Sequence, residues 1–293
     1  MRRLFLFCAL ALASLAAACH PTANETARPP LWRVTDGKST LWLLGSIHML
    51  PPGIEWQDDA VKQAVHEADT LILEIPPTDP AQAGSAFVTA ARAKADVPIE
   101  QRLPTPKRTL LADAIDHSHA SRETLDGMKD WGAALVLAAG DASADGATRE
   151  NGVEAVLTRE FQKKGKPVEG LETLKGQFAI FDSLGHAEQR RLLANAVTDA
   201  AQPDGGYADA LTAWRNGDAK ALSDAADALF TDAPALKSAL LVKRNTAWVA
   251  DLTKRMKQHR GTVLVAVGSG HLVGPQGLPA LLGQRGFKVS RVQ

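Results

Sequence analysis

Three short apolar runs near the two ends of the chain restrict its fold more than any other feature. They cover residues 41–44 (Leu-Trp-Leu-Leu), 70–75 (Thr-Leu-Ile-Leu-Glu-Ile) and 262–267 (Thr-Val-Leu-Val-Ala-Val). Short runs that are apolar on both faces are typical of strands buried inside a sheet that helices cover on both sides. Because the runs come from opposite ends of a chain of 293 residues, we expect one sheet that joins the two ends.

The segments around these runs predict how the strands are connected. Asp36-Gly37 separates the strand-like residues 31–35 from residues 39–44, which is a hairpin signal. Apolar residues at helical spacing fill 58–68, so a helix lies between two of the apolar runs, and such a unit joins parallel strands. Two further short strands are expected, at 166–171 and 287–292.

The middle of the chain is rich in alanine and predicts helices rather than strands. We expect helices through most of residues 80–160 and then, with breaks, at 175–200, around Trp214, at 236–258 and at 279–284. The expected architecture is therefore an α/β fold, with a mixed sheet built from the N- and C-terminal parts of the chain and a large helical insertion between them.

The composition excludes several classes of protein. Hydrophobic residues make up 45% of the chain and charged residues 23%, which is ordinary for a globular protein and excludes a disordered or collagen-like chain. The 33 basic and 33 acidic side chains balance, so the chain lacks the excess of positive charge that is typical of proteins that bind nucleic acid. The only cysteines, Cys8 and Cys19, exclude a disulfide framework.

The first 30 residues are expected to direct export of the protein and to precede its fold. Residues 1–18 combine a basic start with an apolar run too short to span a membrane, and read as a signal peptide. Ordinary cleavage after Ala18 and acylation of Cys19 at a lipobox-like site are both open, and we favour the lipid-anchored form. Residues 19–30 then act as a flexible tether for a domain at 31–293, in the periplasm or elsewhere in the cell envelope.

The sequence Gly-Ser-x-His occurs twice, each time directly after a buried run. The first copy is Gly45-Ser-Ile-His48 and the second is Gly268-Ser-Gly-His271. Glycine lets the backbone turn as it leaves the sheet, and a histidine three residues later then lies over the carboxyl end of its strand. We therefore expect the two histidines to face one crevice.

Glu74 adds a third polar group, near the end of an otherwise apolar run. A buried carboxylate is costly unless it is paired, hydrogen-bonded or metal-bound. Two histidines and a carboxylate suit a divalent ion such as Mn, Co or Zn, held by His48, Glu74 and His271 and able to activate water for hydrolysis. The same residues also suit metal-free general-base catalysis, and their spacing does not separate the two options.

These motifs resemble the TraB/GumN family, which includes the Tiki metalloproteases and is related in fold to erythromycin esterase and ChaN. The resemblance rests on both Gly-Ser-x-His copies, Glu74, residues 165–173 and Arg244-Asn-Thr-Ala-Trp248. It implies a metal-dependent protease site at His48, Glu74 and His271. It also implies a site role for Arg244, which matches an arginine characteristic of the family and is suited to stabilise a substrate carboxylate or an oxyanion.

Different functions are compatible with this site. The first is a cell-envelope metal-dependent hydrolase acting on peptide or protein substrates, with Glu74, His48 and Arg244 as its catalytic residues. The second is a binding protein for haem or another ligand that uses the same crevice without catalysis, and a regulatory partner that has lost its chemistry ranks third. Glu172 is interpreted as the cap of the next helix, and the pair His117 and His119 as solvated residues.

Overall fold

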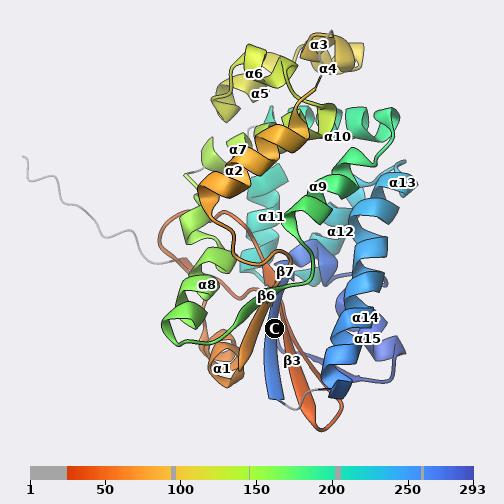
Figure 1. Ribbon diagram of the computed structural model, residues 1–293. Helices are drawn as coiled ribbons and strands as arrows, with labels where there is room; N and C mark the ends of the chain where they lie inside the picture. The colour runs from red at the N-terminus through yellow and green to blue at the C-terminus, as the bar shows by residue number, and fades with distance from the viewer. Residues whose placement is uncertain (1–24, 94–96, 145, 202–205, 259–260) are drawn as a thin grey trace, which may run out of the picture.

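Six described strands form the main sheet, and their arrangement confirms the expected mixed α/β architecture. The computed structural model describes residues 25–93, 97–144, 146–201, 206–258 and 261–293. The strands lie in the order β6-β5-β7-β3-β2-β8 (Figure 1). Their bounds are Val168–Gly170 (β6), Thr70–Leu73 (β5), Gly261–Gly268 (β7), Ser39–Ser46 (β3), Leu31–Thr35 (β2) and Lys288–Arg291 (β8).

The three apolar runs form the centre of this sheet. β7 lies between β5 and β3 and is parallel to both. Its residues Leu264 to Val267 are fully buried, as expected of a strand covered on both faces. β2 pairs antiparallel with β3 through the predicted hairpin, while β6 runs parallel to β5. The carboxyl ends of β3, β5, β6 and β7 therefore share one edge of the sheet.

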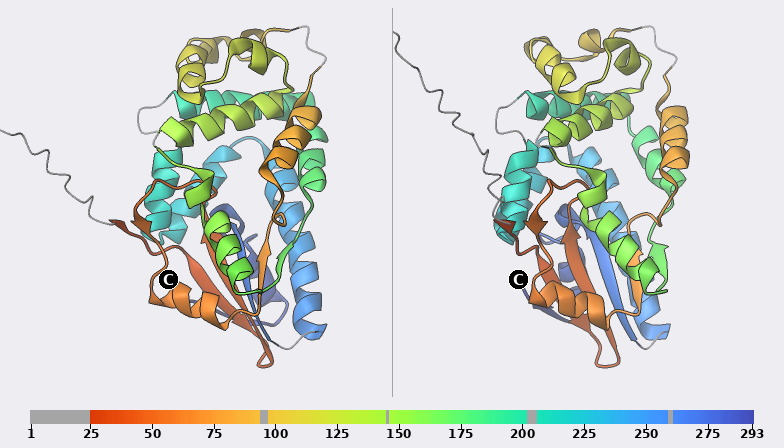
Figure 2. Two further views of the ribbon diagram at one scale, coloured as in Figure 1. Left: turned by 60° about the vertical axis from the view of Figure 1, so that its left-hand side comes forward. Right: turned by 90° about the vertical axis from the view of Figure 1, so that its left-hand side faces the viewer.

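Helices cover both faces of the sheet. α1 (Asp59–Glu67) and α8 (Val153–Lys163) lie on one face, and α14 (Lys243–Gln258) and α15 (Leu278–Gln284) lie on the other (Figure 2). α1 begins where the Asp58 side chain accepts a hydrogen bond from the Val61 N–H group. Its buried residues Val61, Ala64 and Val65 recur at helical spacing, which explains why this helix packs on the sheet.

Most of the other helices lie beyond the carboxyl edge of the sheet and confirm the helical insertion (Figure 1). Helices α5, α7 and α10 enclose an apolar core of their own, which contains Leu137 and Leu193. The helix expected at 175–200 is broken in two near Gly185. The bounds are Pro80–Ala91 (α2), Ile99–Arg102 (α3), Thr105–Arg108 (α4), Leu111–Ser118 (α5), Arg122–Asp126 (α6), Asp130–Ala144 (α7), Leu174–Asp182 (α9), His186–Ala200 (α10), Gly206–Arg215 (α11), Ala219–Leu229 (α12) and Pro234–Lys237 (α13).

The ordered domain begins before residue 31. β1 (Glu25–Thr26) pairs with β4 (Ile54–Glu55), Ala27 is buried, and the Arg28 N–H group donates to the Arg215 carbonyl. The predicted tether at 19–30 is therefore too long, because its last six residues pack against the domain. The predicted signal peptide at 1–18 and Cys19 lie outside the described residues.

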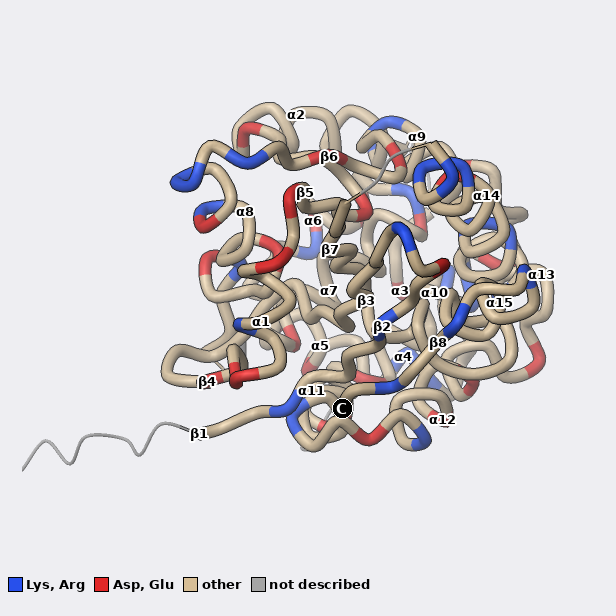
Figure 3. The backbone as a smooth tube through the Cα atoms, turned by 90° about the horizontal axis from the view of Figure 1, so that it is seen from below, with Lys and Arg blue, Asp and Glu red and all other residues tan. Residues whose placement is uncertain are grey.

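Acidic and basic residues are interspersed along the backbone in the view of Figure 3. Among the residues that the structure describes, no helix has both the length and the apolar character needed to cross a bilayer.

Candidate functional site

The two Gly-Ser-x-His segments lie side by side at the carboxyl edge of the sheet. In the parallel pairing of β3 with β7, Ser46 stands opposite Gly268, and the Ser269 hydroxyl donates to the Ser46 carbonyl over 3.1 Å. A Cβ atom at Gly45 would lie 2.7 Å from the Ser269 hydroxyl oxygen, so this close approach requires glycine. The two motifs therefore meet at one edge, as the sequence predicts.

His48 is the exposed residue of the site. Its side chain is 62% exposed, and its Nδ1 atom lies 2.7 Å from Oε1 of Glu154 on α8. The Ser46 hydroxyl donates to the same oxygen over 2.5 Å. The negative charge of Glu154 outweighs the desolvation of the imidazole and raises the pKa of His48 to about 9. At neutral pH His48 is therefore the protonated partner of an ion pair.

Gly152 allows α8 to approach the His48 segment. The Val153 N–H group, at the start of α8, donates to the Ile47 carbonyl over 3.1 Å. A Cβ atom at Gly152 would lie only 2.0 Å from the His48 carbonyl oxygen. Because this neighbour is backbone, a side chain at Gly152 would force the helix and the His48 segment apart.

Gly152→Ala is expected to lower the free energy of unfolding by about 1–3 kcal/mol, the usual cost of overpacking. Urea denaturation followed by circular dichroism measures this change. Gly84→Ala in α2 is the matched control, because a Cβ atom there meets nothing within 4 Å. The control should stabilise the protein by about 0.5–1 kcal/mol, since glycine is the poorer helix former. Equal effects of the two substitutions would contradict this account of Gly152.

Glu74 follows β5 directly, since the strand ends at Leu73 and not at Ile75 as predicted. Its Oε1 atom accepts the Gly268 N–H group at 2.8 Å, and its Oε2 atom accepts Nη2 of Arg244 at 2.6 Å and the amide of Gln177 at 3.3 Å. Burial opposes the charge of this carboxyl, but the charge of Arg244 and the Gly268 N–H group favour it and outweigh burial, so the pKa of Glu74 is lowered to about 2. Glu74 is therefore an ionised, almost fully buried carboxylate.

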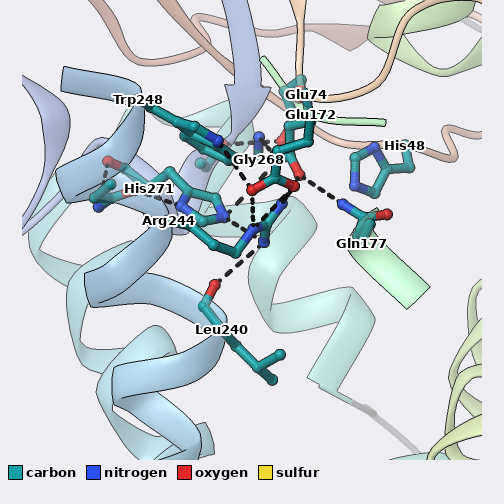
Figure 4. Close-up of polar contacts among 12 residues, drawn as sticks. His48, Glu74, Glu172, Gln177, Leu240, Arg244, Trp248, Gly268 and His271 are labelled. Atoms are coloured by element: carbon teal, nitrogen blue, oxygen red, sulfur yellow. Dashed lines mark hydrogen bonds and ion pairs between the residues drawn. The ribbon is translucent and has the colours of Figure 1, made fainter. Parts of the chain in front are cut away.

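Arg244 connects Glu74 to a second carboxylate. Its Nε and Nη2 atoms donate to Glu172 at 3.0 Å, and its guanidinium carbon lies 4.6 Å from the centre of the Trp248 ring. The π-helix η2 (Ser238–Val242) directly precedes α14, and the Leu240 carbonyl accepts Nη1 at 3.1 Å. Figure 4 shows this network, with His48 and Gln177 to one side of it.

His271 is buried and neutral, unlike His48. The Asn245 amide nitrogen donates to the carbonyls of Gln276 and His271, so its Oδ1 atom is the one that faces Nδ1 of His271, at 2.6 Å. Nδ1 therefore carries the hydrogen, and Nε2 accepts from Nη1 of Arg244 at 3.2 Å. Burial, together with the charge of Arg244, outweighs the effect of Glu74 and lowers the pKa of His271 to about 4.

The arrangement of His48, Glu74 and His271 does not fit a divalent ion held by all three. Nε2 of His271 lies 3.9 Å from Oε1 of Glu74, while Nη1 of Arg244 lies 3.2 Å from the same nitrogen. A metal ion at this nitrogen would meet a guanidinium that two carboxylates hold in place. Within the described ranges, no three His, Cys, Asp or Glu side chains are arranged to hold a metal ion.

Two interpretations from the sequence are corrected by these contacts. Glu172 does not cap the next helix, because the Thr173 side chain caps α9 and Glu172 binds Arg244 and the Trp248 indole. His117 is not merely solvated, because its Nδ1 atom lies 2.6 Å from the Ala200 carbonyl oxygen.

Sequence reasoning did not identify Glu154 or Asn245 as site residues. Asn245 lies in the segment Arg244-Asn-Thr-Ala-Trp248 that carries part of the family resemblance, so a signal for it was present. Glu154 lies in the first turn of an ordinary amphipathic helix, and no motif marks it. Its role depends on where α8 crosses the sheet edge.

Comparisons with known proteins identify the family of the chain. Searches of curated proteins and of solved structures gave no match. The scan against protein families matches residues 30–291 to the TraB/PrgY/gumN family. Since this match spans nearly the whole chain, including every site residue described above, the protein belongs to the TraB/PrgY/gumN family.

Proposed function

We propose that the protein is a hydrolase of amide bonds in peptides, with His48 as general acid and Glu74 as general base. The observation that carries this proposal is that an exposed imidazole, that of His48, and a buried, ionised carboxylate, that of Glu74, lie at the same edge of the sheet (Figure 4). Titratable groups whose surroundings hold them in opposite protonation states are typical of acid–base sites. Family membership supports a shared fold and is compatible with several activities.

The proposed reaction uses one proton donor and one proton acceptor. A water molecule bonded to Glu74 attacks the amide carbon and gives a proton to the carboxylate. His48 donates its Nε2 proton to the leaving nitrogen as the C–N bond breaks, which releases a carboxylic acid and an amine. Exchange with solvent then returns the proton from Glu74 to His48. Arg244 keeps Glu74 in place, because its own nitrogens are bonded to protein groups.

The dependence of activity on pH tests these roles. Because His48 must be protonated, hydrolysis of a broad peptide library should be constant near neutral pH and should fall as the pH rises through about 9. Glu74, with its pKa lowered to about 2, stays ionised over this whole range. A rate that increases as the pH rises toward 9 would assign His48 as a base. Absence of hydrolysis across the library would refute the proposed function itself.

A metal-dependent form of this hydrolase is the alternative. It would place Mn, Co or Zn on His48, Glu74 and His271. In both histidines Nδ1 is bonded to a protein acceptor, as is common in histidines that bind a metal through Nε2. It requires Arg244 to leave Nε2 of His271. Metal analysis of the purified protein, with assays before and after EDTA, distinguishes the two forms. Haem binding without hydrolysis, tested by a Soret titration of wild type and His48→Ala, would favour the ligand-binding function.

The proposed place of action is the cell envelope. This part rests on the apolar N-terminus at residues 1–18 and on Cys19 as the attachment point of a lipid. Labelled palmitate should be incorporated into the wild-type protein and not into Cys19→Ala. Equal labelling of both proteins, or of neither, would remove the lipid anchor from the proposal.

A further inference from the structure

We infer that Glu154 is a positioning residue for His48, which holds the Nδ1 hydrogen and thereby leaves Nε2 as the atom that meets the substrate. The inference deepens the proposed function, and only its kinetic consequence rests on that function. It starts from a contact between two distant parts of the chain, in which Oε1 of Glu154 lies 2.7 Å from Nδ1 of His48. A carboxylate on one ring nitrogen fixes both the tautomer and the orientation of an imidazole.

Glu154 is held from the side of β3. The Ser46 hydroxyl donates to Oε1 of Glu154 over 2.5 Å, and the Ser46 carbonyl accepts the Ser269 hydroxyl over 3.1 Å. The oxygen that faces His48 is thus tied to the ends of both Gly-Ser-x-His strands. Ser46 is therefore the second hydrogen-bond donor to this carboxylate, beside His48.

Glu154 is also held from the side of α8. It is the second residue of that helix, where a negative charge interacts favourably with the helix dipole. The first residue, Val153, donates its N–H group to the Ile47 carbonyl, and Gly152 lies against the His48 carbonyl. The helix start and the His48 segment are therefore fixed to each other, so the carboxylate cannot move independently of the imidazole.

The other oxygen of the carboxylate shows that this contact is not simply good packing. Oε2 of Glu154 is buried and has no hydrogen-bond partner in the described structure. A buried carboxylate with one unpaired oxygen is costly unless a cation compensates its charge. His48 is the group that lies against this carboxylate, with its Nδ1 atom 2.7 Å from Oε1. A neutral side chain would fill the same space at lower cost, so the carboxylate is best explained by its effect on His48.

The test is the NMR signal of the His48 ring N–H groups in protein labelled with ¹⁵N-histidine. Wild type should give a downfield Nδ1–H signal that exchanges slowly with water and disappears in His48→Gln. We expect this signal to be lost in Glu154→Ala. In Glu154→Gln it should remain but move upfield, because an amide oxygen is a weaker acceptor than a carboxylate. Glu160→Gln, the same change on the same helix, should leave the signal unchanged.

Activity measurements complete the test. Glu154→Gln should lower kcat by about 10-fold to 100-fold with KM within about twofold, the pattern of an oriented acid–base group rather than of substrate binding. Circular dichroism identifies any variant that fails to fold, and Glu154→Gln preserves the shape of the side chain. An unchanged Nδ1–H signal in folded Glu154→Ala, or an unchanged kcat in Glu154→Gln, would overturn the inference. Loss of the signal together with an inactive wild type would support Glu154 and refute only the hydrolase.

Discussion

Arg244→Met is expected to lower the free energy of unfolding by about 3–5 kcal/mol, because removing one partner of a buried ion pair leaves the other charge uncompensated. Here two carboxylates would be left, since Glu74 and Glu172 both bind the guanidinium, and Glu74 is almost fully buried and Glu172 largely so. Methionine fills similar space and keeps the contact with Trp248. The loss in free energy of unfolding therefore reflects the missing charge more than a missing side-chain volume. Urea denaturation at neutral pH measures it.

Arg255 provides the matched control for this prediction. It lies on the same helix and binds Glu169 and Asp251, but its ion pairs are partly exposed. Arg255→Met should therefore cost no more than about 1 kcal/mol. Adding Glu74→Gln and Glu172→Gln to Arg244→Met should restore part of the lost stability. If both substitutions lower the free energy of unfolding by a similar amount, burial does not make the Arg244 network more stabilising than the partly exposed one.

His48→Gln is expected to reduce turnover by about 10²-fold to 10⁴-fold, the usual contribution of a general acid. The same change removes the partner of the largely buried Glu154 carboxylate, so it should also lower the free energy of unfolding, by about 1–3 kcal/mol. Initial rates on the best peptide substrate, combined with denaturation curves, separate the two effects. Loss of turnover under conditions in which the variant is still fully folded is the signature of a catalytic role.

Two other histidines serve as controls for His48. His66→Gln, at an exposed position on α1, should change neither activity nor stability. His271→Gln should lose stability, because the imidazole is buried between Asn245, Arg244 and Trp248. If His48→Gln retains wild-type turnover, the exposed imidazole is not the proton donor and the proposed reaction fails.

The sheet was predictable because its signal lies in local sequence. Runs such as residues 41–44 and 262–267 are apolar on both faces, and only a covered central strand has that requirement. The strand ends then placed Glu74 and His271 at one edge by geometry alone. The early end of β5 was not predictable from hydropathy, because Ile75 continues the apolar pattern past the last paired residue.

The partners of the site residues were harder to predict than the residues themselves. Glu154 approaches His48 because α8 begins against the Ile47 carbonyl, and Glu172 reaches Arg244 because the start of α14 lies beside the segment that follows β6. Such contacts depend on how helices pack in three dimensions, which no spacing along one sequence encodes. The difference between a charged His48 and a neutral His271 has the same origin, since identical motifs receive a carboxylate in one case and an amide in the other.

The central position of β7 sets the order in which the protein can fold. This strand separates β5 from β3, although it comes long after both of them in the chain. A nascent chain that ends before residue 261 contains both β5 and β3 but lacks β7, the strand that pairs with both of them. The sheet therefore closes only after β7 has been synthesised, through contacts between segments that lie far apart in the chain, which is the slow type of folding.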